Sequence, residues 1–200
     1  MSERKANSKA TEPFILASAS ARRRELLAEL LDDFEVTVAE VEELPSHPGG
    51  SSSLVAANAR LKARFVATKR PASWVLGADT IVTLGDEVLG KPADLDEAIS
   101  MLNFLSGKTH EVSTGLCLVH LANGYEETRV ETSKVTFRSL DDGTIAEYFA
   151  EVDPLDKAGG YAIQIRGELI VAGFEGSRSN VIGLPLEMLG EWLRSLELAV

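Results

Sequence analysis

Three consecutive arginines mark the first candidate site for chemistry in this sequence. Arg22, Arg23 and Arg24 directly follow residues 17–21, a stretch of alternating alanine and serine. Adjacent like charges repel one another, so such a cluster either faces water or binds an anion. A strand, a small-residue turn and a helix start would also point backbone N–H groups at an anion, as phosphate sites do. The local pattern leaves both alternatives open, a cluster that faces water and a site for an anion such as phosphate.

Two further charges interrupt apolar patterns. Lys62 lies on the apolar face of a predicted helix over residues 54–69. It is either a lysine that extends from the rim of the core into water or a cation held beside a ligand. Asp79 lies in a predicted strand, where aspartate is uncommon and costly to bury. It either ties down the turn after Gly77 or supplies a functional carboxylate, and the pattern leaves both alternatives open.

The remaining charged candidates lie next to turns. The acidic residues Glu40, Glu42 and Glu43 precede a loop rich in proline and glycine, and Lys91 precedes Pro92. Carboxylates without neighbouring histidines suit a hard cation such as Mg²⁺ or Mn²⁺, while lysine and arginine suit phosphate groups. Taken together, these residues predict phosphate-ester chemistry with a divalent metal.

Other familiar catalytic patterns are missing from the sequence. It contains no G-x-S-x-G, G-x-x-x-x-G-K-[ST], G-x-G-x-x-G or H-E-x-x-H motif. The three histidines, His47, His110 and His120, lack the spacing of metal ligands. The single cysteine, Cys117, lies in an apolar strand-like run and is expected to be buried.

Composition limits the classes of partner. The 200 residues are 44% hydrophobic and 26% charged, with a net charge of −11, which is typical of one acidic globular domain. The acidic balance argues against nucleic acid or an anionic membrane as partner. No apolar run approaches the ~20 residues of a membrane helix. Residues 1–13 lack a signal-peptide core and are expected to be disordered. One cysteine permits no intrachain disulfide, and we expect a reducing, cytoplasmic location.

Strand and helix patterns alternate along the chain. Strands are predicted at residues 14–18 and 34–40, on both sides of the turns at 85–86 and 122–124, and at 159–165 and 168–174. Helices are predicted at residues 22–31, 54–69, 94–107, 139–151 and 184–196. Serines at 51–53, Asp94 with Glu97, and Ser139 with Asp142 are the expected helix-start signals. The sequence therefore predicts one mixed α/β domain over residues 14–200.

Several blocks of sequence resemble one known family. These blocks are ASASARRRELL, LGADTIV, GKPAD, LSGKTHEVSTG, PLDKAGGYAIQ and VIGLPLEML, and their order is that of Maf proteins, the nucleotide pyrophosphatases also called septum-formation proteins. The resemblance covers residues 14–195. It implies a mixed-sheet α/β fold, similar to that of inosine triphosphatases, with a nucleotide cleft between two lobes and a homodimeric assembly. The implied reaction converts a nucleoside triphosphate and water into a monophosphate and pyrophosphate.

The resemblance also assigns roles to the charged candidates. Asp79 matches the catalytic aspartate, as proton acceptor or metal ligand, and Glu43 matches the acidic residue after the second strand. A divalent cation, Mg²⁺ or Mn²⁺, would be held by these two carboxylates. Lys62 and Lys91 match the family's two phosphate-facing lysines.

The small-residue turn and three further positions complete the implied site. Ser18, Ser20 and Arg23 match the turn that binds phosphate. Arg22, Thr80 and Gln164 are similar to the branch that acts on dTTP and UTP, where the 7-methyl-GTP branch carries tryptophan, glutamine and glutamate. A glutamine side chain can both donate to and accept from a uracil or thymine edge.

The sequence departs from the family pattern twice. Ala21 stands where the family has proline, which removes a fixed φ angle from the turn. The residue after Gln164 is Ile165 where the family has glycine, so the loop there is expected to differ in shape.

The leading interpretation is a dTTP/UTP pyrophosphatase for nucleotide-pool sanitation or division control. Its expected substrates are dTTP and UTP, with modified pyrimidine nucleotides as further candidates. The alternatives are a 7-methyl-GTP pyrophosphatase and a nucleotide-binding regulator of septum formation that does not turn over.

Overall fold

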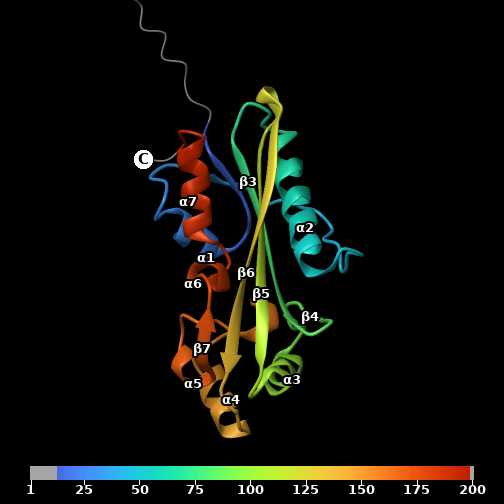
Figure 1. Cartoon of the computed structure of the whole chain (residues 1–200), viewed down its shortest axis with the longest axis vertical. Coiled ribbons are helices and arrows are strands. Elements are labelled where there is room, and N and C mark those ends of the chain that lie inside the picture. The colour runs from blue at the N-terminus through green and yellow to red at the C-terminus, as the bar shows by residue number, and fades with distance from the viewer. Residues whose placement is uncertain (1–12, 199–200) are drawn as a thin grey trace, which may run out of the picture.

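The computed structural model describes residues 13–198, and one seven-stranded sheet runs through them (Figure 1). The strands are β1 (Ile15–Ala17), β2 (Glu35–Val36), β3 (Val75–Leu84), β4 (Glu87–Leu89), β5 (Thr109–His120), β6 (Tyr125–Phe137) and β7 (Val171–Glu175). Their order is β2-β1-β3-β5-β6-β7, with β4 paired to β3. β1 pairs in parallel with β2 and β3, and the other pairs are antiparallel. The predicted mixed α/β sheet is confirmed.

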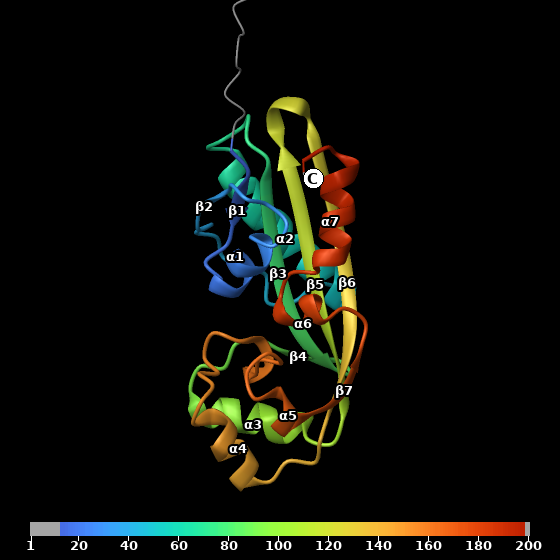
Figure 2. The same cartoon turned by 90° about the vertical axis from the view of Figure 1, so that its left-hand side faces the viewer.

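Helices surround the sheet in two lobes. They are α1 (Ala21–Leu27), α2 (Gly50–Ala67), α3 (Leu95–Leu105), α4 (Asp142–Phe149), α5 (Gly167–Ile170), α6 (Arg178–Ile182) and α7 (Leu186–Ser195), with 3-10 turns at Leu121–Asn123 and Ala158–Gly160. Figure 2 shows α1, α2 and α7 around one end of the long strands and α3, α4 and α5 around the other. Among the described residues, no helix is both long enough and apolar enough to cross a membrane.

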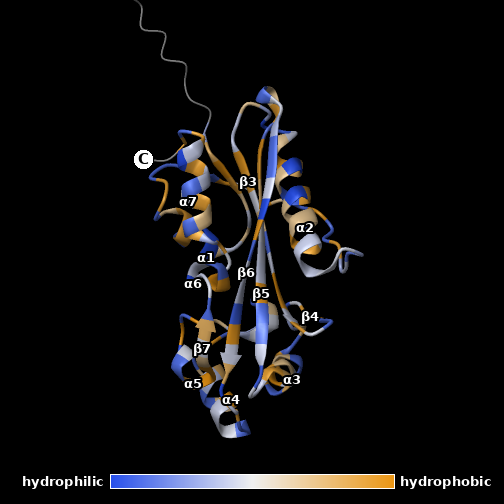
Figure 3. Ribbon diagram, viewed as in Figure 1, coloured by the Kyte–Doolittle hydropathy of each residue, from blue (hydrophilic) through white to orange (hydrophobic). Residues whose placement is uncertain are grey.

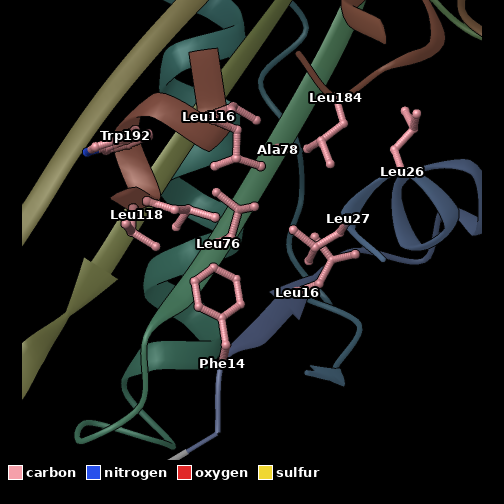
Figure 4. Close-up of a cluster of buried hydrophobic side chains, with 12 residues drawn as sticks. Phe14, Leu16, Leu26, Leu27, Leu76, Ala78, Leu116, Leu118, Leu184 and Trp192 are labelled. Atoms are coloured by element: carbon pink, nitrogen blue, oxygen red, sulfur yellow. The ribbon is translucent and has the colours of Figure 1, made fainter. Parts of the chain in front are cut away.

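The alternation of β3 divides its side chains between two helical layers. Leu76 and Ala78 pack with Trp192 of α7 and Leu27 of α1 in one buried cluster (Figure 4). Successive side chains of a strand point to opposite faces, so Val75 joins a second cluster against α2. Figure 3 shows hydrophobic and hydrophilic residues interspersed along α2 and α7, as expected for helices with one buried face.

Two glycines bring α2 unusually close to the sheet. A Cβ atom on Gly77 would lie 2.2 Å from the carbonyl oxygen of Ala59, and one on Gly115 would lie 2.5 Å from that of Val55. Such distances are far inside van der Waals contact, so only glycine lets the helix backbone pack here. Gly115 is also the register partner of Asp79 on β3. The spacing of α2 from β3 is therefore set beside Asp79.

Several predicted elements are confirmed. The turn at Gly85 joins β3 to β4, and residues 121–124 join β5 to β6. The Asp94 side chain caps α3 by accepting from the Glu97 N–H at 2.8 Å. Cys117 is buried, as expected.

Other predictions are wrong in their details. Residues 159–165 form no strand, because Gly159 and Gly160 have φ angles of 69° and 73°, outside the extended region. Residues 168–174 divide between α5 and β7. The strand over residues 34–40 shortens to two residues.

Helix boundaries also differ from the sequence prediction. α2 begins at Gly50, so the serines expected before the helix lie within its first turn. Asp141, rather than Ser139, caps α4 through the Thr144 N–H. α1 ends at Leu27, and α6 was not predicted. The lead-in predicted for residues 1–13 lies outside the described residues, apart from Pro13.

Candidate active site

A cavity of about 750 Å³ is lined by residues of both lobes. One side comes from the turn before α1, from α2 and from β3, and the other comes from residues 88–91 and 156–164. All ten site residues predicted from the sequence line this cavity: Ser18, Ser20, Arg22, Arg23, Glu43, Lys62, Asp79, Thr80, Lys91 and Gln164. The fold thus brings together side chains from distant parts of the chain.

Asp79 lies at the centre of an ion-pair cluster against α2. Its side chain is buried, and Oδ1 lies 2.7 Å from the Lys62 ammonium. The same ammonium lies 3.0 Å from Glu43 Oε1. Lys62 therefore points to two carboxylates instead of extending into water, and Asp79 pairs with α2 instead of tying down the turn after Gly77. Both carboxylates converge on one positive charge.

Asn58 is a member of this cluster that sequence reasoning missed. Its Nδ2 donates to Asp79 Oδ2 at 3.2 Å and to the Leu44 carbonyl at 3.2 Å. Its Oδ1 accepts from the Leu44 N–H at 2.8 Å. Asn58 precedes Lys62 by four positions, one helical turn, so the spacing places both on one side of α2. That spacing is the signal that could have identified it.

Arg23 connects the turn before α1 to two other segments. Its guanidinium donates to the Ala78 carbonyl at 3.1 Å, the Gly183 carbonyl at 2.8 Å and Thr80 Oγ1 at 2.9 Å. It also donates to Ser18 Oγ at 3.4 Å. Burial lowers the pKa of Arg23 from its usual value, although nearby carboxylates oppose that shift. Because these bonds use four of the five N–H groups of the guanidinium, Arg23 mainly holds this wall of the cavity together.

The turn itself is fixed by its serines. Ser18 Oγ accepts from the Ser20 N–H at 3.2 Å, and Ser20 Oγ caps α1 by accepting from the Arg23 N–H at 3.4 Å. Ser18 is buried, whereas Ala21 is exposed. The hydroxyls therefore supply turn geometry that proline at position 21 would otherwise support.

Arg22 reaches across to residues that the sequence reasoning left without a role. Its Nη1 lies 2.6 Å from Asp156 Oδ2, and its Nη2 donates to the Asp156 carbonyl at 3.1 Å. Asp156 also accepts from Lys157, whose buried ammonium donates to the Asp153 carbonyl at 2.6 Å. Burial alone would raise the pKa of Asp156, but bonds from Lys157 and Arg22 outweigh it and lower that pKa.

Gln164 lies in a segment held by a buried tyrosine. The Tyr148 hydroxyl donates to the Ala162 carbonyl at 2.9 Å and accepts from the Ala162 N–H at 2.8 Å. Gln164, two residues later, is half-buried in the cavity wall. After Ile165, which stands where the family has glycine, Arg166 adopts a φ of 48° and pairs with Glu147, Glu151 and Glu168.

The charges of the cavity contrast with those of the whole chain. Five cationic side chains line it, whereas its carboxylates are those of Glu43, Asp79 and Asp156. The chain as a whole carries a net charge of −11. Lys91 is exposed at the cavity wall and, within residues 13–198, forms no ion pair. This local excess of positive charge suits a polyanion.

The cavity offers carboxylate oxygens to the expected divalent metal. No group of three or more candidate metal ligands lies together in the described part of the chain. Mg²⁺ commonly takes one or two carboxylates, with waters and substrate phosphates as its other ligands. The two carboxylates that share the Lys62 ammonium, Glu43 and Asp79, fit that arrangement.

Known proteins are similar to this chain over most of its length. The family model described as Maf-like protein matches residues 13–196. A protein of Myxococcus xanthus named dTTP/UTP pyrophosphatase is 52% identical over 185 residues, covering 92% of this chain and 91% of that protein. A protein of the same name from Thermococcus gammatolerans is 44% identical over 175 residues, covering 88% and 92%.

A solved structure gives an independent view of the fold. The structure of a HAM1 protein from Coxiella burnetii matches with a TM-score of 0.54 at 17% identity, covering 92% of this chain and 99% of that one. At this identity the likeness concerns the fold alone. The match of the family model to nearly the whole chain shows more: this chain belongs to the Maf-like protein family.

Proposed function

We propose that this protein is a nucleoside triphosphate pyrophosphatase that converts dTTP and UTP into the monophosphate and pyrophosphate. The observation that carries the proposal is the convergence of Asp79, its lysine partner and the three base-choice residues on one cavity. The names of relatives such as the 52%-identical Myxococcus xanthus protein support the choice of dTTP and UTP.

The cationic side chains would bind the triphosphate. Lys91, exposed at the wall, and Lys62, at the carboxylate pair, are the two lysines we assign to phosphate oxygens. Arg23 would position Ser18 and Ser20 around the same group through its bonds to the turn and to β3. Such groups accelerate the reaction when they bind the charge of departing pyrophosphate more strongly than that of the bound substrate.

The reaction proposed for this site is attack of water on the α-phosphorus. A bond forms between the water oxygen and the α-phosphorus, the bond to the β-phosphate bridging oxygen breaks, and pyrophosphate leaves with that electron pair. Asp79 accepts the proton that water loses, as a positioned general base. Lys62, whose ammonium lies 2.7 Å from Asp79 Oδ1, holds the Asp79 carboxylate in place before substrate arrives.

Glu43 and Asp79 are the residues we assign to a divalent cation. When bound, Mg²⁺ or Mn²⁺ would supply charge neutralisation of the triphosphate and acidify a coordinated water. Removal of metal with EDTA should abolish turnover, and added Mg²⁺ or Mn²⁺ should restore it.

Base choice is assigned to Arg22, Thr80 and Gln164. The Thr80 hydroxyl already contacts Arg23 and Thr114, at 2.9 Å each, so we assign it to shaping the pocket. Gln164 then supplies the amide that can pair with a uracil or thymine edge. Gln164→Glu should reduce the preference for UTP over CTP, measured as the ratio of kcat/KM values, more than it reduces Tm.

We also propose a cytoplasmic homodimer that acts on nucleotides and not on nucleic acid. The family resemblance supports the dimer, and the net charge of −11 disfavours a polynucleotide partner. Light scattering after size-exclusion chromatography would give the mass of the assembly, and a monomer would exclude the dimer.

The test of the activity is a panel of nucleotides with and without Mg²⁺. We expect pyrophosphate release from UTP and dTTP at a kcat/KM well above that for ATP, GTP, CTP and 7-methyl-GTP. Preferred hydrolysis of 7-methyl-GTP would support the alternative specificity. Tight nucleotide binding with no release of pyrophosphate would instead identify a non-catalytic regulator.

A further inference from the structure

We infer that Asn58 is a positioning residue that fixes the two acidic side chains of the site, Asp79 and Glu43, in position relative to each other. This inference rests on the proposed function, because it concerns the carboxylates assigned to the metal and the proton. Asn58 touches neither the phosphates nor the base in that assignment, and acts through its neighbours.

Every polar atom of the Asn58 side chain is used in this connection. The two Nδ2 hydrogens go to Asp79 Oδ2 and to the Leu44 carbonyl, at 3.2 Å each, and Oδ1 accepts from the Leu44 N–H at 2.8 Å. The side chain is 2% exposed, so water does not compete for these bonds. One planar amide therefore connects the strand that carries Asp79 to the segment that carries Glu43.

The segment around Glu43 depends on this connection. Residues 37–49 form neither helix nor strand. Within the described chain, the backbone of residues 38–46 is held by two hydrogen bonds, both between Leu44 and the Asn58 side chain. Glu43 immediately precedes Leu44, and its own carboxylate is half exposed, with a side-chain exposure of 52%. Without Asn58, the salt bridge to Lys62 would be the main restraint on Glu43.

The chemistry of the side chain explains why asparagine suits this position. Aspartate could accept from the Leu44 N–H but could not donate to Asp79, and it would place a second negative charge against it. Leucine would leave the Leu44 backbone groups and one Asp79 oxygen without a partner in a buried place. The close packing of α2 at Gly77 and Gly115 keeps Asn58 within reach of β3.

The main test compares Asn58→Ala and Asn58→Ser with the wild type. We expect kcat for UTP at saturating Mg²⁺ to fall about 10- to 100-fold, the effect typical of removing a residue that orients a ligating group. KM for UTP should change less than about threefold, because the phosphate and base contacts stay in place. Serine is the second variant because it retains a hydroxyl and leaves a smaller void.

A readout independent of turnover follows the same variants. Mn²⁺ binding, measured by electron paramagnetic resonance with a non-hydrolysable α,β-methylene analogue of UTP, should weaken about 10-fold or more. In a double-mutant cycle, Asn58→Ala should cost much less kcat in a Glu43→Gln background than in the wild type, because coupled residues are not additive.

Asn180→Ala is the matched control for loss of a buried amide. Asn180 is fully buried and donates to the Val112 carbonyl and to Ser133 Oγ. Its loss should lower Tm without weakening Mn²⁺ binding. The inference is overturned if the Asn58 variants keep wild-type kcat and Mn²⁺ affinity, or if Asn180→Ala reproduces their pattern. Failure of the wild type to hydrolyse UTP would instead refute the proposed function.

Discussion

Asp79 is a buried carboxylate whose side chain is held by one cationic partner, Lys62, and one amide partner, Asn58. Asp79→Asn preserves size but removes the proton acceptor. We expect kcat for UTP to fall at least ~100-fold, the order typical of losing a general base, while circular dichroism shows a retained fold. Asp86→Asn, in the exposed turn after β3, is the control. Near-normal turnover by folded Asp79→Asn would exclude the assigned role.

Lys62 gives a prediction in which packing and charge disagree. An apolar side chain there would complete the stripe of Val55, Ala59 and Val66, so periodicity alone predicts that Lys62→Met raises stability. The structure predicts the opposite, because methionine leaves the buried Asp79 carboxylate without its cation. We expect both Tm and kcat to fall. Lys69→Met, near the exposed end of α2, serves as control, and an unchanged kcat would count against a role for Lys62 in catalysis.

At the scale of elements, α4 positions a loop of the cavity wall through one hydroxyl. Tyr148→Phe preserves the ring but removes the hydroxyl, which makes hydrogen bonds to both the N–H and the C=O of Ala162. We expect a loss of about 1–3 kcal/mol in the free energy of unfolding, since a buried N–H and C=O become unpaired. KM for UTP should also rise, because Gln164, which is assigned to the base, lies two residues after Ala162 in the same segment. Urea unfolding and steady-state kinetics measure the two effects, and Phe149→Leu, beside it on α4, is the packing control.

Elements with strong local signals could be predicted from the sequence. The turn at 122–124 and the Asp94 cap depend on residues close in sequence, and both were found. Residues 159–165 misled because the alternation of Tyr161 and Ile163 is typical of a strand. The adjacent glycines Gly159 and Gly160 have positive φ angles, which an extended strand does not allow. Tyr161 and Ile163 are nevertheless buried, because the loop that carries them packs against the core.

The site was predicted in its charged residues and missed in its supporting ones. Asp79 and Lys62 stood out because each contradicts the pattern around it. Asn58 and Asp156 stand out less, since the signal for uncharged Asn58 is its spacing from Lys62, and aspartate in a turn is ordinary. Their roles depend on Leu44 and Arg22, which only the folded chain brings near.

For the whole molecule, His110 gives stability a dependence on acid pH. Its ring is buried against Tyr161 and Phe137, and burial lowers its pKa to about 4. The unfolded chain has a histidine pKa near ~6.5, so between these values it binds more protons than the folded chain. Stability is therefore fully present above about pH 6.5 and is lost as the pH falls toward 4, by about 3 kcal/mol in total.

The measurement is the free energy of unfolding in urea at pH 7 and pH 4.5. His110→Gln retains a group that can bond to the Tyr161 hydroxyl, now at 2.7 Å from His110 Nε2, but does not titrate. The variant should lose clearly less stability than the wild type over this interval. Equal losses in both proteins would show that other groups cause the acid sensitivity.

Gly77 and Gly115, which pack against α2, also limit which substitutions could raise the thermostability of this protein. Replacing glycine by alanine is a common route to thermostability, because it restricts the unfolded chain. At Gly77 or Gly115 the added methyl group would press on the carbonyl of Ala59 or Val55 and push the helix outward. The same displacement would draw Asn58 and Lys62 away from Asp79. Both glycines should therefore be kept when the protein is engineered for heat resistance. The close packing of α2 on β3 that they allow also sets the contacts of Asn58 and Lys62 with Asp79.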